Sequence, residues 1–188
     1  MNLFELGILD GIAEIFRCAP LDFIMPKITL LGEGGIAVIL LAIILICIPK
    51  TRRTGFMVGA ALLMGLIVCN IILKPVIARP RPYDVRGIMP YLASVQSDFS
   101  FPSGHTIACF ECATVLFIRY RKWGIAALVV AALVSFSRMY LYLHYPSDVM
   151  VSIVLGVFFG WLACVIINKI YARWFDNKDK NKDANAAL

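Results

Sequence analysis

The sequence predicts an all-α membrane protein: a polytopic helical bundle of five transmembrane spans with an N-terminal helix in the membrane interface. Hydrophobic residues make up 61% of the 188 residues and charged residues only 16%, and the mean hydropathy is +0.83. A soluble domain is usually about half apolar and a quarter charged. The chain also contains five long apolar stretches, each approaching the ~20 residues that a membrane span needs.

The first 17 residues favour an interfacial helix at about 3–17. Apolar and charged side chains there fall on opposite sides of a helix, with Phe4, Ile8, Ile12, Ile15 and Phe16 on one side and Asp10, Glu14 and Arg17 on the other. This pattern is typical of a helix lying in the plane of the interface. A sixth span running into residues 21–28 is an alternative, against which Pro20, Pro26 and the scattered charges argue.

The five apolar stretches predict one membrane-embedded domain over 1–175, followed by a polar cytoplasmic tail at 176–188. The spans are predicted at 33–49, 55–73, 103–118, 123–142 and 148–168. Six cysteines lie mostly inside these stretches and are interpreted as buried apolar residues, without a structural disulfide or a zinc site.

Cations cluster on one side of the five-span topology. This side carries Lys50, Arg52, Arg53, Arg119, Arg121, Lys122, Lys169 and Arg173. Short loops rich in Lys and Arg stay in the cytoplasm, so the C-terminus is predicted to be cytoplasmic and the loops 74–102 and 139–147 to face the extracellular or periplasmic side. The net charge of +6 is therefore a topology signal that also suits anionic membrane lipids, and it gives no reason to expect a nucleic-acid partner.

Three cations, Lys74, Arg79 and Arg81, are interleaved with prolines at the outer end of the second span. Taken alone, they could be snorkelling anchors of a helix end. Arg79 could bind a second phosphate, neutralise lipid head groups or anchor the helix, and the last two are favoured.

The third span opens with Pro102-Ser103-Gly104-His105. Ser103 is a plausible N-cap, and Gly104 lets a ligand approach the backbone. Exposed amides at a helix N-terminus bind phosphate, although an ordinary helix cap would leave the same pattern.

The fourth span ends at Ser137-Arg138, and His144 and Asp148 follow before the last span. A carboxylate there can accept a hydrogen bond from one ring nitrogen, which fixes the tautomer so that the other nitrogen can attack a substrate. The alternative is a hydrogen-bonded helix start. A second such cluster on the same side of the membrane favours catalysis.

Together these residues resemble the three-part signature of the type 2 phosphatidic acid phosphatase superfamily, and the span pattern from about residue 30 to 168 resembles its short bacterial members. The signature is Lys74, six residues, Arg81-Pro82; then Pro102-Ser103-Gly104-His105; then Ser137-Arg138, five residues, His144, three residues, Asp148. The resemblance implies hydrolysis of phosphomonoesters or diphosphates through a phosphohistidine, without metal or cofactor.

The resemblance also implies a role for each position. His144 would be the nucleophile, Asp148 its orienting carboxylate and His105 the general acid. The phosphoryl oxygens would be held by Lys74, Arg81, Ser103, Gly104 and Arg138. This division suits phosphoryl transfer, whose catalysis consists mostly of positioning and charge stabilisation.

The expected substrate is a lipid phosphate or diphosphate. Undecaprenyl diphosphate is the first choice, phosphatidylglycerophosphate or phosphatidic acid comes next, and a non-catalytic anionic lipid binder or transporter is a remote alternative. The loop 83–101 is predicted to be the substrate gate, with Arg86 and Asp98 solvated. Glu111, inside the third span, is either functional or a structural group, and the structural interpretation is favoured. The sequence makes no prediction of oligomeric state.

Overall fold

The computed structural model describes residues 3–186, with side chains described for residues 3–173, and this part of the chain contains helices and no strand. The N-terminal half forms α1 Leu3–Phe16, α2 Ala19–Leu30, the short η1 Glu33–Gly35, α3 Ile36–Cys47, α4 Arg52–Gly65, η2 Leu66–Leu73, α5 Lys74–Ile77 and α6 Pro82–Arg86. The C-terminal half forms α7 Gly104–Arg119, α8 Arg121–Tyr140 and α9 Pro146–Ala186. The all-α prediction is confirmed.

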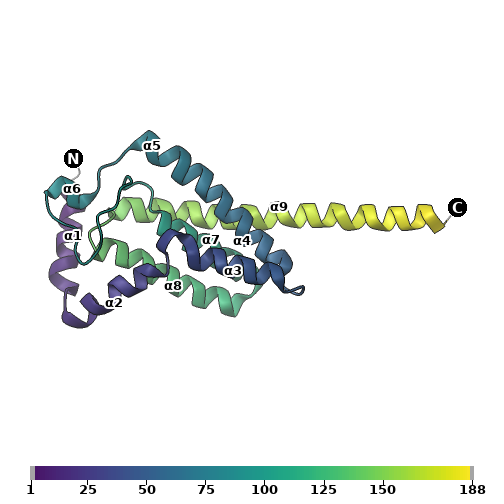
Figure 1. Ribbon diagram of the computed structural model, residues 1–188, viewed down its shortest axis with the longest axis horizontal. Helices are drawn as coiled ribbons and strands as arrows, with labels where there is room; N and C mark the ends of the chain where they lie inside the picture. Colours follow the sequence, from purple (N-terminus) through teal and green to yellow (C-terminus); the bar gives the residue numbers. More distant parts are fainter. Residues whose placement is uncertain (1–2, 187–188) are drawn as a thin grey trace.

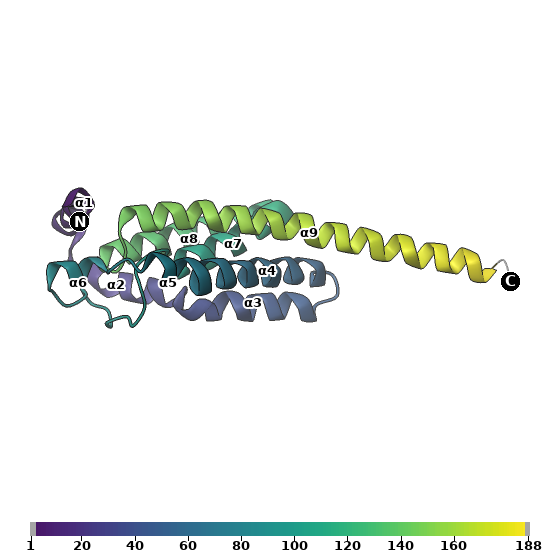
Figure 2. The same cartoon turned by 90° about the horizontal axis from the view of Figure 1, so that it is seen from above.

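Helices α3, α4, α7, α8 and α9 form an elongated bundle, α1 lies at one end of it, and α9 extends beyond its other end (Figures 1 and 2). α7 packs against α4, α8 and α9, and most of its side chains are buried. The end of the bundle near α1 also holds α6 and the loop that follows it (Figure 2).

Four helical segments of the described chain are long and apolar enough to cross a membrane: Ala19–Cys47, Arg52–Arg86, Arg121–Tyr140 and Pro146–Arg173. α7, predicted as the third span, has 16 residues and lies among these segments. The membrane-protein prediction is supported, whereas the number of spans, the single domain over 1–175 and the cytoplasmic tail at 176–188 stay predictions.

The first apolar segment differs from the prediction because α2 forms despite its prolines. Pro20 lies in the first turn of α2, where a missing N–H breaks no helical bond, and Pro26 lies inside the helix. Gly34 and Gly35 adopt positive φ angles of 54° and 67°, a conformation that glycine reaches without steric cost. The chain therefore changes direction between α2 and α3, and α3 alone has only 12 residues.

The predicted N-terminal helix is present as α1, but it contacts the protein through a different face. Leu6 and Leu9 pack into a core cluster that includes Tyr83 and Tyr142. Phe4, by contrast, is 76% exposed. Its location in a membrane interface stays a prediction.

The second predicted span ends in a π-helical segment, η2, that leads into Lys74. The backbone N–H of Lys74 donates to the carbonyl of Cys69, five residues earlier. The next residue is Pro75, which lacks an N–H and whose ring would clash with the carbonyl four residues before it. The wider π turn accommodates this proline and brings the buried Lys74 to the end of the bundle.

Glycines allow α9 to lie close against α7. A Cβ at Gly156 would lie 2.9 Å from the carbonyl oxygen of Ile107, and one at Gly160 would lie 2.8 Å from that of Glu111. Small residues at such positions let membrane helices pack tightly. The glycines of α9 thus hold α7, and the residues at its start, in the centre of the bundle.

Gly160→Ala is expected to destabilise the protein by about 1–3 kcal/mol, because the added methyl group overpacks a rigid backbone contact. Gly59→Ala is the matched control, since no atom lies within 4 Å of its Cβ position and alanine favours the helix by about 0.5–1 kcal/mol. Thermal unfolding in detergent measures both variants. A melting temperature of Gly160→Ala equal to or above that of Gly59→Ala would contradict this packing.

Candidate active site

A cavity of about 630 Å³ opens at the end of the bundle that carries the three sequence motifs. Six of the eight predicted site residues line it: Lys74, Arg81, Gly104, His105, Arg138 and His144. Ser103 and Asp148 are fully buried and lie behind this lining. Three segments far apart in sequence therefore meet at one cavity.

Arg81 is held by partners from two other segments. Its side chain, 2% exposed, donates from Nε to the carbonyl of Asp98 at 2.9 Å and from one terminal nitrogen to the carbonyl of Leu143 at 2.9 Å. The same nitrogen lies 3.3 Å from Nε2 of His144. The guanidinium thus fixes the loop before α7 and the turn before α9 around the histidine.

Asp98 forms ion pairs with both Lys74 and Arg81; its side chain is 49% exposed, as predicted, but it is engaged by two cations of the site. Burial raises the pKa of this carboxyl, but hydrogen bonds and charges from Lys74 and Arg81 outweigh burial and lower the pKa to about 2. Two of the three predicted phosphate-binding cations therefore share one carboxylate of the loop 83–101. Arg86 is likewise exposed, as predicted, and pairs with Asp10 of α1.

His144 is held at Nδ1 by a group that the sequence did not point to. Nδ1 lies 2.6 Å from the carbonyl oxygen of Ser100 and 3.8 Å from Oδ2 of Asp148, which is an ion-pair distance and too long for a hydrogen bond. A carbonyl can only accept, so Nδ1 carries the proton and Nε2 is left basic. The expected direct His–Asp hydrogen bond is replaced by one to the Ser100 backbone, in a loop whose spacing gives no signal.

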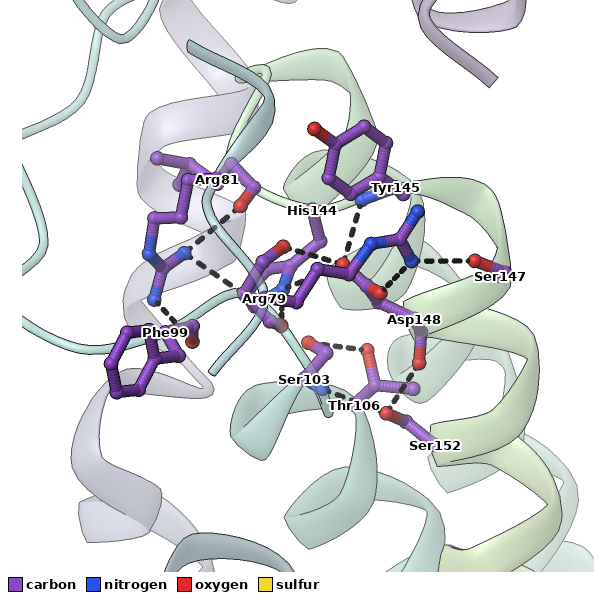
Figure 3. Close-up of polar contacts among 12 residues, drawn as sticks. Arg79, Arg81, Phe99, Ser103, Thr106, His144, Tyr145, Ser147, Asp148 and Ser152 are labelled. Atoms are coloured by element: carbon purple, nitrogen blue, oxygen red, sulfur yellow. Dashed lines mark hydrogen bonds and ion pairs between the residues drawn. The ribbon is translucent and has the colours of Figure 1, made fainter. Parts of the chain in front are cut away.

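Asp148 stands behind His144 as an anchored carboxylate (Figure 3). Its Oδ2 accepts from Oγ of Ser100 at 2.5 Å and from the backbone N–H of Tyr145 at 3.0 Å. Ser100 therefore contacts Asp148 through its hydroxyl and His144 through its carbonyl, and connects the two residues.

Burial sets the protonation state of His144. The imidazole is 1% exposed. Burial, together with Arg138 and Arg81, lowers its pKa to about 4, although Asp148 opposes this shift. The neutral ring dominates at neutral pH. A neutral imidazole with a basic Nε2 is the form required of a nucleophile.

His105 is placed differently from His144. Its Nε2 is buried and has no hydrogen-bond partner among the described residues, yet the residue lines the cavity. Gly32, at the end of α2, packs against it: a Cβ there would lie 2.9 Å from Cδ2 of His105. The bend between α2 and α3 thus fixes the ring, a contact that sequence reasoning missed.

Arg138 reaches the cavity from the end of α8. One terminal nitrogen donates to Oγ1 of Thr29 at 2.7 Å, while Nε is buried without a partner among the described residues. Thr29 belongs to α2, outside all three motifs. Arg138 therefore keeps donor capacity for an anion in the cavity.

Ser103 and Gly104 differ in what they can offer a phosphoryl group. The N–H of Ser103 donates to Oγ of Ser152 at 2.8 Å and its Oγ accepts from Thr106 at 3.1 Å; Ser103 occupies the N-cap position but makes no side-chain cap hydrogen bond. At Gly104 a Cβ would come no closer than 3.4 Å, to Asn70. Packing therefore tolerates a side chain at Gly104, so its predicted role in letting a ligand approach the backbone stays a prediction.

Away from the cations, the cavity becomes an apolar groove between α3 and α4. Its walls include Ile39, Ile43, Leu62, Leu63 and Leu66. The loop 83–101, predicted to be the gate, contributes only Gln96 and Asp98 to the lining. Glu111 is buried in this groove against Gly65, where a Cβ would collide with its carboxyl group, and its Oε1 has no hydrogen-bond partner among the described residues. The structural interpretation of Glu111 stays a prediction.

Comparisons with known proteins agree with this site. The family model of the PAP2 superfamily matches residues 54–172. Undecaprenyl-diphosphatase BcrC of Bacillus subtilis is 34% identical over 145 residues, which cover 76% of this chain and 72% of that protein. Lipid A 4'-phosphatase of Bacteroides thetaiotaomicron is 34% identical over 113 residues, 56% of this chain and 50% of that protein. The crystal structure of the PAP2 type phosphatidylglycerolphosphate phosphatase from Bacillus subtilis superposes with a TM-score of 0.72 at 27% identity, covering 90% of this chain and 87% of that one.

The fold, the cation-lined cavity and these relatives define a membrane phosphatase of lipid phosphates. The chain belongs to the PAP2 superfamily, because the family model covers more than half of it and includes all three motifs. The resemblance predicted from the motifs is confirmed.

Asp98→Asn is expected to tighten the binding of inorganic phosphate on the order of tenfold, because Lys74 and Arg81 lose the carboxylate that now neutralises them. Asp84→Asn is the matched control, with the same change of charge at an exposed position of α6. Competitive inhibition by phosphate measures the effect. An inhibition constant of Asp98→Asn that is unchanged or weaker would contradict the competition between Asp98 and phosphate.

Proposed function

We propose that the protein hydrolyses a lipid diphosphate to the monophosphate at the outer face of the membrane through a phosphohistidine, with undecaprenyl diphosphate as the substrate. The observation that carries this proposal is the position of both histidines in one cavity with Lys74, Arg81 and Arg138. Cations alone would bind an anion. A neutral imidazole with a basic Nε2 beside an unpartnered second imidazole suits nucleophilic attack and proton transfer.

In the first step, Nε2 of His144 attacks the terminal phosphorus and the bond from phosphorus to the leaving oxygen breaks. The three cations and the amide of Gly104 bind the phosphoryl oxygens, where they stabilise the charge of the transition state. His105 donates a proton to the leaving oxygen. Asp148 and the Ser100 carbonyl keep Nδ1 of His144 protonated and stabilise the imidazolium.

In the second step, water attacks the phosphohistidine and His144 leaves as the neutral ring. His105, now deprotonated, accepts a proton from the water. The products are inorganic phosphate and the lipid monophosphate, and both histidines return to their starting states. This cycle places no step on a metal ion.

Two observations support a long isoprenoid substrate. The groove between α3 and α4 is lined by aliphatic side chains, which suits a hydrocarbon tail, and the relative BcrC is named an undecaprenyl-diphosphatase. Phosphatidylglycerophosphate is the second candidate, because the similar solved structure is named as its phosphatase. The outer-face location is supported by the distribution of cations between the two sides of the bundle.

The purified protein, assayed by phosphate release with EDTA present, is expected to have a higher kcat/KM for undecaprenyl diphosphate than for phosphatidylglycerophosphate or phosphatidic acid.

His144→Ala should lower kcat by about 10⁴-fold or more on every substrate, because the nucleophile is lost. Equal or faster turnover of the glycerolipids would contradict the substrate, and retained activity of His144→Ala would contradict the mechanism.

His105→Ala serves as the internal comparison. Its loss of kcat should fall within about 10²- to 10⁴-fold and be larger for phosphatidic acid, whose leaving alkoxide needs a proton, than for the diphosphate. Lipid binding without turnover in the native protein would favour the non-catalytic alternative.

A further inference from the structure

Glu5 of α1 is a buried carboxylate that reaches the back of the active site. Its side chain is 6% exposed, Oε1 accepts from the backbone N–H of Ser147 at 2.9 Å, and Oε2 accepts from Arg79 at 2.5 Å. Glu5 lies outside residues 54–172, to which the family model extends. α1 therefore contributes a charge to the site from outside the matched region.

Arg79 joins this carboxylate to Asp148. One terminal nitrogen donates to Oδ1 of Asp148 at 2.5 Å and to Oγ of Ser147 at 2.7 Å (Figure 3). The other donates to Glu5. The guanidinium also stacks 3.8 Å above the ring of Tyr145. None of the three roles predicted for Arg79 accounts for these contacts: both terminal nitrogens are engaged by carboxylates of the protein.

The contacts continue from Asp148 to the nucleophile. Its Oδ1 is held by Arg79, and its Oδ2 by Ser100, whose carbonyl holds Nδ1 of His144. A continuous chain of polar contacts therefore runs from Glu5 through Arg79, Asp148 and Ser100 to His144.

These contacts compensate the buried negative charge of Asp148. Asp148 is fully buried, and a buried carboxylate is costly unless it is paired and hydrogen-bonded. Arg81 and Arg138 are cations that act on His144, but both line the cavity, where the proposed substrate would bind. Arg79 balances Asp148 from behind, and Glu5 in turn keeps Arg79 in the fork geometry that suits two carboxylates.

We propose that Arg79 and Glu5 are positioning residues of the phosphatase: they hold Asp148, and through Ser100 the ring of His144, in the orientation for attack. This inference rests on the mechanism proposed above. Neither residue contacts the substrate, so both act on kcat and leave KM nearly unchanged. Glu5 acts on Asp148 through Arg79 and also through the backbone N–H of Ser147, so its contribution shrinks when Arg79 is absent.

The test compares Arg79→Gln, Arg79→Lys, Glu5→Gln and the double variant Glu5→Gln/Arg79→Gln. Arg79→Gln should lower kcat by about 10- to 100-fold, as for other residues that orient a partner of the reacting group, with KM within about twofold. Arg79→Lys should recover part of the loss, and Glu5→Gln should lower kcat by less. The double variant should lose less kcat than the product of the two single losses, because residues in one hydrogen-bond network are not additive.

Arg86→Gln is the matched control. Arg86 pairs with Asp10 and so ties α1 to α6, as Arg79 ties α1 to α9, but it is exposed and does not contact Asp148. The control should keep wild-type kcat, while thermal unfolding in detergent verifies that every variant is folded. An equal loss of kcat in Arg86→Gln would assign the effect to the docking of α1 and overturn the proposal.

The titration of His144 supplies a readout that a structural role would not move. The chain has two histidines, so nitrogen NMR resolves them, and His105→Ala assigns the remaining signal. Arg79→Gln should raise the pKa of His144 from about 4, because Asp148 loses its ion pair with Arg79 and then favours the imidazolium more strongly, whereas Arg86→Gln should not.

An unchanged kcat and an unchanged His144 titration in Arg79→Gln, a rise of KM alone, or additive losses in the double variant would each overturn the positioning role. His144→Ala separates this outcome from a failure of the mechanism. If His144→Ala is inactive while Arg79→Gln is fully active, only the positioning role is wrong.

Discussion

The site depends on the burial of one guanidinium, that of Arg81. Its partners are the carbonyl and carboxylate of Asp98, the carbonyl of Leu143 and Nε2 of His144. A buried charge requires such complete pairing, so the loop before α7 and the turn before α9 can adopt only arrangements that supply these acceptors. His144, the proposed nucleophile, is thereby held beside the cation that would bind its target phosphoryl group.

Around Arg81 the protein separates its charges into two layers. Lys74, Arg81 and Arg138 face the cavity, where a phosphoryl group would bring the compensating negative charge. Asp148, Arg79 and Glu5 lie behind His144 and compensate each other. Because charges interact more strongly where water is excluded, the front layer can stabilise a transition state. The back layer holds Asp148 and, through Ser100, the orientation and tautomer of the imidazole.

The apolar stretches predicted the fold class, because each membrane span is a continuous run of residues. The motifs predicted six of the residues that line the cavity, because residues at the ends of spans keep fixed spacings. The pairing of Lys74 and Arg81 with Asp98 could not be predicted, since loop charges carry no periodicity. Ser100 acts on His144 through a backbone carbonyl, which every residue possesses. Thr29 belongs to α2, a helix that prolines argued against, and Gly32 lies just after it. The contact of Glu5 with Arg79 joins residues 74 positions apart.

The most direct test of the account is the detection of the covalent intermediate. During steady-state turnover of undecaprenyl diphosphate, an alkaline quench followed by peptide mass spectrometry should find one phosphoryl group on His144, and the modification should be acid-labile. It should be absent in His144→Ala and should accumulate where transfer of the phosphoryl group to water is slowed, as expected in His105→Ala. Turnover without any phosphorylated His144 peptide, or phosphorylation at His105, would contradict the roles assigned to the two histidines.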